Sequence, residues 1–286
     1  MLFRPSRVRR VTAFPSFLLG VVIASAQSPA TPAPKREVIW NNPPEKPSAL
    51  VSHHELASQA MQRTVGYTLY LPPGYTDAAD RDFPVVYFLH GAGGNENADG
   101  PAFAGIVDRL IRADRVPAVI CVFPNGGMSG YRDHPESGIN VETMLIEDLI
   151  PTIDATYRTQ ARREARVIGG YSMGGGGAIR LALTHPDLFS AAASWAGAVV
   201  DFRSGEIPRE LSVDKLRDQS PTVRVLMITG YDDEVTHRGH WPFVELLRDA
   251  KYPFTLRTLR GVPHNLGRYY ELTGEEFALF LLGELK

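Results

Sequence analysis

The sequence predicts an α/β fold, in which a mainly parallel central sheet carries helices on both faces. Its 286 residues are 44% hydrophobic and 22% charged, which suits a globular chain with one large core. Nearly continuous apolar runs, typical of strands covered on both faces, occupy residues 84–89, 118–123, 167–169, 191–196 and 223–228. Helical patterns alternate with them at residues 103–113, 141–157, 175–184, 241–250 and 271–285. Ligands of such folds bind beyond the carboxyl ends of the strands, so we expect the functional residues in the loops that follow them.

The first 26 residues are expected to form a signal peptide. Four arginines precede an apolar stretch at residues 11–23, and Ala24-Ser25-Ala26 then offers a cleavage site with small residues. Cleavage there predicts an exported protein, periplasmic or extracellular, that starts at Gln27. A membrane anchor is the alternative, but Pro15 interrupts the stretch, which is shorter than the roughly 20 apolar residues of a span.

Residues 27–48 are rich in proline and predict a spacer, and residues 49–286 are expected to form a single catalytic domain. Residues 1–26 hold four arginines and no acid, so their removal changes the formal charge from −2 to −6. That balance disfavours nucleic acid as a partner, and no later apolar run is long enough for a membrane span. Cys121 is the sole cysteine, which excludes an internal disulfide. The oligomeric state is left open.

Two of the predicted strands differ in how their apolar residues are spaced. Residues 65–71 alternate between apolar and other side chains, as in a half-buried antiparallel strand, and a Pro-Pro-Gly sequence follows. Residues 118–123 are apolar throughout, so Cys121 is interpreted as a packing residue of a buried strand rather than a nucleophile.

A candidate nucleophile follows the predicted strand at residues 167–169. Gly170-Tyr171-Ser172-Met173-Gly174 matches G-x-S-x-G, and a predicted helix comes directly after it. In a nucleophile elbow the serine occupies a sharp turn, where small residues two positions before and after allow strand and helix to approach. The bare pattern also fits an ordinary glycine-rich turn, so its place between strand and helix is what points to Ser172 as a nucleophile.

A serine nucleophile needs hydrogen-bond donors for the oxyanion that forms on the attacked carbonyl. One is expected at the backbone of Met173, the other in the glycine-rich loop 89–94 that leaves the strand at residues 84–89. We predict Ala92 for the second donor, with Gly91 as the alternative. A phosphate-binding loop is the competing interpretation, but neither G-K-[ST] nor G-x-G-x-x-G is present here. His90 is expected to support the loop.

The base and the acid should follow the serine in the order acid, then histidine, and at strand ends. His264 follows the predicted strand at residues 254–259 and is the predicted base. Three carboxylates follow the strand at residues 223–228, and we favour Asp233 over Asp232 and Glu234, although spacing alone does not decide. His237 and His240 are spaced like a metal pair, but no third ligand is evident, so no metal is predicted.

With these residues in place, the sequence resembles the putative-esterase family of α/β-hydrolases, which includes feruloyl and acetyl-xylan esterases, S-formylglutathione hydrolases and mycolyltransferases. The matching segments cover most of the chain after the signal peptide, at residues 65–75, 89–94, 124–127, 147–151, 169–175, 185–189, 230–233 and 264. The resemblance implies an α/β-hydrolase fold, and it favours Asp233 because that family's acid stands three residues after the glycine. Leu266 departs from the aromatic that often follows the family's histidine, so feruloyl specificity is not predicted.

The leading hypothesis is a serine esterase that acts on a small-molecule or carbohydrate-linked ester without cofactor or metal. Ser172 would attack the ester, His264 would carry the proton, Asp233 would orient His264, and Met173 and Ala92 would hold the oxyanion. Two alternatives remain. An acyltransferase would pass the acyl group to an alcohol instead of water, and a catalytically silent binding protein would keep the scaffold without the reaction. The loop at residues 128–138 is expected to border the site.

Overall fold

The computed structural model describes residues 37–46, 48–77, 79–200 and 205–285, and one compact unit spans Val38–Lys286. The predicted signal peptide and the first part of the predicted spacer therefore lie outside the described residues. Val38 to Asn42, in the second part of that spacer, belong to the compact unit, and Trp40 is 8% exposed.

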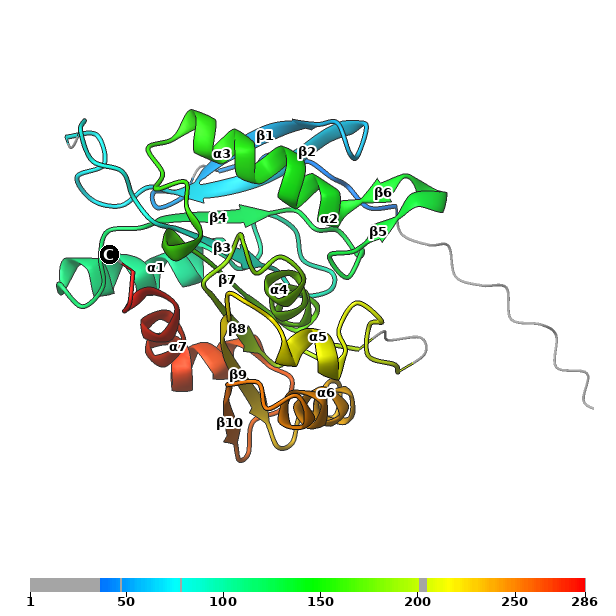
Figure 1. Cartoon of the computed structure of the whole chain (residues 1–286). Coiled ribbons are helices and arrows are strands. Elements are labelled where there is room, and N and C mark those ends of the chain that lie inside the picture. The colour runs from blue at the N-terminus through cyan, green and yellow to red at the C-terminus, as the bar shows by residue number, and fades with distance from the viewer. Residues whose placement is uncertain (1–36, 47, 78, 201–204, 286) are drawn as a thin grey trace, which may run out of the picture. The chain divides into compact units, whose positions relative to one another are not determined.

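Eight strands form the central sheet, in the order β1-β2-β4-β3-β7-β8-β9-β10 (Figure 1). β1 and β2 pair antiparallel, β2 pairs antiparallel with β4, and every other neighbouring pair is parallel. The predicted α/β fold with a mainly parallel sheet is therefore confirmed. The strands are β1 Ser52–Ser58, β2 Arg63–Tyr70, β3 Val85–Leu89, β4 Ile120–Pro124, β7 Arg166–Tyr171, β8 Ala191–Trp195, β9 Arg224–Gly230 and β10 Thr255–Leu259.

The main helices are α1 Gly100–Arg112, α4 Met173–Thr184, α5 Val213–Arg217, α6 His237–Asp249 and α7 Leu266–Leu282. The predicted helix at residues 141–157 is built from α2 Val141–Thr143, a π-helical stretch Met144–Leu149 and α3 Ile150–Thr156. α7 begins five residues before its predicted start, because the Asn265 side chain accepts a hydrogen bond from the Arg268 backbone and caps the helix. A short hairpin of β5 Asp133–His134 and β6 Ile139–Asn140 precedes α2, and turns at Pro135–Ser137 and Arg163–Ala165 are 3₁₀-helical.

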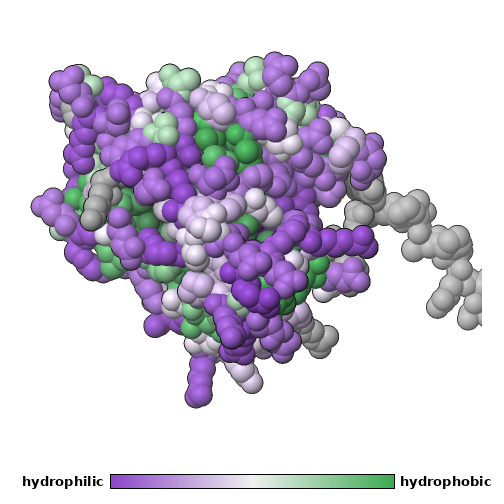
Figure 2. Space-filling view, in the orientation of Figure 1, coloured by the Kyte–Doolittle hydropathy of each residue, from purple (hydrophilic) through white to green (hydrophobic). Residues whose placement is uncertain are grey.

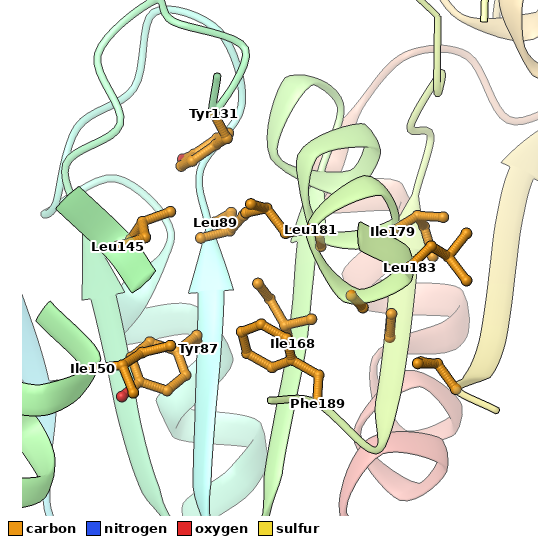
Figure 3. Packing of buried hydrophobic residues seen from close by; sticks show 14 of the residues in the cluster. Tyr87, Leu89, Tyr131, Leu145, Ile150, Ile168, Ile179, Leu181, Leu183 and Phe189 are labelled. Carbon is orange, nitrogen blue, oxygen red and sulfur yellow. The ribbon is translucent and has the colours of Figure 1, made fainter. Parts of the chain in front are cut away.

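The sheet separates two hydrophobic layers. α1 and α7 pack on one face, with side chains such as Phe103 and Phe277, and α4 and α6 pack on the other, with Ile179 and Phe243 (Figure 1). Successive residues of β3 point into opposite layers, so that strand is buried throughout. Figure 3 shows the hydrophobic layer between α4 and the sheet, to which Leu181 of α4 and Ile168 of β7 both contribute. This two-sided burial explains why the parallel strands are continuous apolar runs in the sequence.

None of the described helices is long and apolar enough to cross a membrane. The face in Figure 2 is mostly hydrophilic, with hydrophobic surface confined to small areas.

Candidate active site

Ser172 occupies a sharp turn between β7 and α4. Its backbone has φ 53° and ψ −118°, a strained conformation for a residue with a side chain. The neighbouring glycines make the turn possible: a Cβ at Gly170 would lie 2.6 Å from the Gly174 carbonyl, and a Cβ at Gly174 would lie 2.1 Å from the Leu89 oxygen. The local sequence therefore supplies the geometry of a nucleophile elbow, which lifts the serine hydroxyl off the end of the strand.

The hydroxyl, imidazole and carboxyl groups of Ser172, His264 and Asp233 lie in series. Nε2 of His264 is 2.9 Å from Oγ of Ser172, and Nδ1 of His264 is 2.8 Å from Oδ2 of Asp233. Asp233 lies directly after β9 and His264 between β10 and α7, so three strand ends bring the groups together. In a neutral imidazole, Nδ1–H donates to the carboxylate and Nε2 is left to accept the hydroxyl proton.

The three consecutive carboxylates have different surroundings. Asp233 is fully buried, and its Oδ1 accepts hydrogen bonds from the backbone N–H groups of Val235 and Thr236, both at 3.1 Å. Burial alone would raise the pKa of Asp233, but the hydrogen bonds from His264 and Thr236 outweigh it and hold the pKa below its usual value. Asp232 is exposed and accepts from the Gly261 backbone at 2.7 Å, which ties the acid loop to the loop of His264. Asp233 is the carboxylate that contacts the imidazole.

Two tyrosines that sequence reasoning did not assign to the site support this arrangement. Tyr269 is fully buried in α7, and its hydroxyl lies 3.2 Å from Oδ2 of Asp233 while it accepts from the Gly230 backbone at 2.7 Å. Tyr171 stacks on the His264 ring, with centroids 5.0 Å apart and an interplanar angle of 27°. The signal for Tyr171 was its place beside the serine, whereas Tyr269 lies before the predicted start of the last helix and had no comparable signal.

The predicted oxyanion loop lies against the nucleophile, since a Cβ at Gly91 would be 3.5 Å from the Ser172 Cβ. Burial raises the pKa of the Asp99 carboxyl group, and the Gly91 backbone offsets only part of that rise. Among the described residues, the Ala92 N–H has no hydrogen-bond partner. Met173 is the first residue of α4, where backbone N–H groups have no acceptor within the helix. The oxyanion role of these two N–H groups stays a prediction.

His90 braces the loop from behind. Its Nδ1 donates to the Gly91 carbonyl at 2.8 Å, and its Nε2 accepts from the Gly126 N–H at 2.9 Å, which defines a neutral tautomer. Burial lowers the pKa of His90 and keeps it neutral. Next to it, Gly127 touches Trp40: a Cβ there would lie 2.7 Å from the indole ring. Trp40 therefore packs against the segment at residues 124–127, which in turn contacts His90.

His237 and His240 lie in the first turn of α6. His237 accepts a hydrogen bond from the Trp241 indole at 3.0 Å, and His240 is buried with Nδ1 3.3 Å from the Gly197 carbonyl oxygen. Within the described parts of the chain, no group of three or more metal-ligating side chains occurs.

A cavity of about 200 Å³ opens beside Met173, one residue after Ser172. Part of its wall comes from residues 128–134 of the loop expected from the sequence to border the site. Its lining is Met128, Ser129, Gly130, Arg132, His134, Met173, Gly176, Gly177, Arg180, Ala198, Val199 and Val200. The sequence did not point to Arg180, which lies in the interior of α4.

An eight-stranded, mostly parallel sheet with a serine at the turn after a central strand defines an α/β-hydrolase. The chain belongs to the esterase family whose model is described as "Putative esterase" and matches residues 58–280. The predicted family and the predicted α/β-hydrolase fold are both confirmed.

Individual relatives agree with this family. An esterase of Mycobacterium tuberculosis is 33% identical over 149 residues, which are 51% of this chain and 32% of that protein. An endo-1,4-beta-xylanase/feruloyl esterase of Xylanibacter ruminicola is 32% identical over 130 residues, 42% of this chain and 18% of that protein. The chain thus matches a third or less of the length of these relatives.

Solved structures share the fold. A ferulic acid esterase from Anaeromyces mucronatus superposes with a TM-score of 0.71 at 21% identity, covering 86% of this chain and 96% of the other. An S-formylglutathione hydrolase from Agrobacterium tumefaciens superposes with a TM-score of 0.68 at 18% identity, covering 82% and 95%.

Proposed function

We propose that this chain is an exported serine esterase that hydrolyses carboxylic esters through an acyl-enzyme on Ser172. The observation that carries the proposal is the series of contacts from Ser172 through His264 to Asp233 at 2.9 and 2.8 Å. The order of the three residues along the chain, Ser then Asp then His, is that of α/β-hydrolase triads.

The reaction would run in two steps. Oγ of Ser172 attacks the ester carbonyl while Nε2 of His264 takes its proton, and the N–H groups of Met173 and Ala92 donate to the oxyanion. His264 then gives the proton to the departing alcohol, which leaves an acyl group on Ser172. Water, deprotonated by His264, attacks the acyl-enzyme, and His264 returns the proton to Oγ of Ser172 as the acid is released. Every proton in this scheme moves through side chains of the chain itself.

Asp233 has two tasks in this scheme. It holds Nδ1–H of His264, which fixes the tautomer that leaves Nε2 free to act as a base. It also stabilises the imidazolium that forms when the serine proton is transferred. A carboxyl group with a depressed pKa suits the second task, because it carries its negative charge at neutral pH and can offset the charge of the imidazolium.

The substrate class follows from the relatives only in outline. One relative is named as an endo-1,4-beta-xylanase/feruloyl esterase, so we propose a small-molecule or carbohydrate-linked ester as the substrate of this chain. Export rests on the signal sequence at residues 1–26. Its test is the N-terminus of the protein recovered outside the cytoplasm, which should begin at Gln27, whereas an intact Met1 would argue against cleavage.

Turnover of a short p-nitrophenyl ester tests the proposal. Ser172→Ala should abolish turnover and labelling by a fluorophosphonate probe, because the probe needs the activated hydroxyl. The matched control is Ser129→Ala, which removes a hydroxyl from the cavity wall but leaves the nucleophile in place. Turnover that persists in Ser172→Ala would reject the serine mechanism. Unlabelled, inert wild-type protein would instead favour a binding protein on this scaffold.

A further inference from the structure

The cavity beside Ser172 has one apolar wall and one polar wall. The apolar wall is made of small residues of α4 and of the segment after β8, Gly176, Gly177, Ala198, Val199 and Val200. The polar wall carries Ser129, Arg132, His134 and Arg180. No Asp or Glu is among the described residues that line it. A group that fills this cavity would therefore meet both aliphatic and polar side chains.

Two of the polar side chains are already engaged with the protein. Oγ of Ser129 donates to the Gly126 carbonyl at 2.7 Å, and Nε2 of His134 donates to the Ser129 carbonyl at 2.9 Å. Arg180 differs from both. It is 3% exposed, and its five N–H donors meet three acceptors among the described residues: the Tyr131 carbonyl at 2.6 Å, Glu142 Oε2 at 2.7 Å and Glu210 Oε1 at 3.4 Å.

The nitrogens of Arg180 share these acceptors unequally. Nη2 serves the two short contacts, Nη1 has the single long one to Glu210, and Nε has none among the described residues. A buried guanidinium short of acceptors is unfavourable, because each donor taken from water without a partner loses free energy. An oxygen of a bound molecule at the cavity wall would supply the missing acceptor to Nη1.

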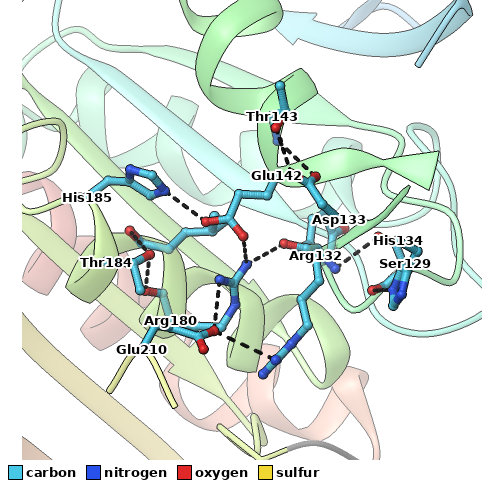
Figure 4. A network of polar contacts seen from close by, with 12 residues as sticks. Ser129, Arg132, Asp133, His134, Glu142, Thr143, Arg180, Thr184, His185 and Glu210 are labelled. Carbon is cyan, nitrogen blue, oxygen red and sulfur yellow. Dashed lines mark hydrogen bonds and ion pairs between the residues drawn. The ribbon is translucent and has the colours of Figure 1, made fainter. Parts of the chain in front are cut away.

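Charge balance decides what kind of oxygen fits. Figure 4 shows Arg180 between Glu142 and Glu210, with Arg132 on the far side of Glu210, and the Arg132–Glu210 contact measures 3.7 Å. The two carboxylates stand behind the cavity wall and balance the two guanidinium groups. A further carboxylate would add uncompensated negative charge, whereas a carbonyl, hydroxyl or ether oxygen accepts a hydrogen bond without it.

The position of the cavity selects the acyl side of the ester. The alcohol must leave next to His264, which protonates it. None of the cavity lining comes from the loop of His264 or from the acid loop after β9, whereas Met173, whose N–H faces the oxyanion in the proposed mechanism, belongs to it. The substituent that points away from His264 is the acyl group, so the cavity is placed to receive it.

We propose that this cavity is an acyl subsite for short acyl groups that carry a neutral oxygen acceptor, recognised by Arg180. The inference rests on the proposed serine esterase function. It predicts selectivity for the acyl group.

A matched pair of substrates tests it in the wild-type protein. p-Nitrophenyl valerate and levulinate have the same leaving group and chain length, and a ketone replaces the γ-methylene in levulinate. After subtraction of hydrolysis without enzyme, kcat/KM should be roughly tenfold or more higher for levulinate, as for one added hydrogen bond to a charged donor. Equal values for the two esters would overturn the proposal.

Two variants test whether the polar residues of the cavity cause the levulinate preference. Arg180→Met should bring the levulinate preference, which is the ratio of the two kcat/KM values, to about one, whatever the change in either value alone. Glu210→Gln, at a residue 38% exposed that tolerates substitution more readily, should shift preference from levulinate toward the anionic hemisuccinate ester by several fold. Glu275→Gln is the matched control, because Glu275 pairs with Arg115 on the other face of the sheet.

Fluorophosphonate labelling separates the two hypotheses. A protein that is labelled and hydrolyses valerate and levulinate equally retains the serine mechanism and refutes the subsite. A Glu210→Gln variant that folds, shown by an unchanged Tm, and keeps the wild-type preferences also refutes it. A folded wild-type protein that is neither labelled nor active refutes both.

Discussion

The hydroxyl of Tyr269 donates a hydrogen bond to Oδ2 of Asp233, the same oxygen that accepts Nδ1–H of His264. Burial raises the pKa of Tyr269 above its usual value, so the hydroxyl keeps its proton and remains a donor. Its other contact is with the Gly230 N–H, at the end of β9. Tyr269 thereby fixes the carboxyl group relative to the strand from which the acid loop departs, and it acts on the reaction only through Asp233.

Removing this hydroxyl tests its role as a positioning residue. Tyr269→Phe leaves the Gly230 N–H buried without an acceptor, and we expect a loss of about 1–2 kcal/mol in the free energy of unfolding. We also expect kcat to fall about tenfold with KM nearly unchanged, because the carboxylate is less well oriented while the substrate contacts stay. Thr273→Ala, which removes a buried hydroxyl one turn later in α7, controls for stability alone. A kcat equal to that of this control would show that Tyr269 only stabilises the fold.

The neighbouring acids give a second prediction. Asp233→Asn should lower kcat about a thousandfold or more, because an amide no longer fixes the imidazole tautomer or stabilises the imidazolium. Asp232→Asn is the matched control one residue away, and it should keep activity within a few fold, since Asp232 contacts the Gly261 backbone and not His264. Steady-state kinetics on one ester measures both. A larger loss in Asp232→Asn would transfer the role to that residue.

Sequence patterns predicted the elements whose burial is uniform. β3 and β4 lie between two hydrophobic layers and are apolar throughout, so they were predicted directly. β1 was not predicted: it lies at the sheet edge, its sequence SHHELAS is mostly polar, and it pairs on one side only, with β2. Its strand conformation depends on that pairing, which no local periodicity reports.

The residues of the candidate site also fall into those that the sequence predicted and those that it did not. Ser172, Asp233 and His264 follow strands, and topology alone brings the ends of parallel strands to one edge, so order and position were enough to predict them. Arg180 lies in the interior of α4 and Tyr269 one turn into α7, and no sequence motif singles out either residue. Their importance depends on which side chains the fold places opposite them.

A pair of glycines tests the elbow itself. In Gly174→Ala the new methyl group would lie 2.1 Å from the Leu89 oxygen, which is backbone and cannot move aside, so we expect a loss of about 3 kcal/mol or more in stability together with loss of activity. Gly105→Ala, in α1, would meet only side-chain atoms at 3.9 Å. That variant should gain about 0.5–1 kcal/mol, because alanine favours a helix interior. Chemical denaturation measures both, and equal effects would contradict the close approach of α4 and β3.

Acid stability should depend on Glu142. Although burial alone would raise the pKa of Glu142, hydrogen bonds and charge from His185 and Arg180 lower it from 4.5 to about 2. A depressed pKa means that the ion pair contributes its full stability above the unfolded value of 4.5 and loses it as the pH falls toward 2. The difference corresponds to about 3 kcal/mol. Glu142→Gln should therefore be less stable than wild type at neutral pH and should lose less stability between pH 5 and pH 2, as denaturation measured over that range would show. Glu136→Gln, at an exposed position of the preceding turn, is the matched control and should follow the wild-type curve. If Glu142→Gln also follows the wild-type curve, the Glu142 carboxylate does not make this contribution to stability.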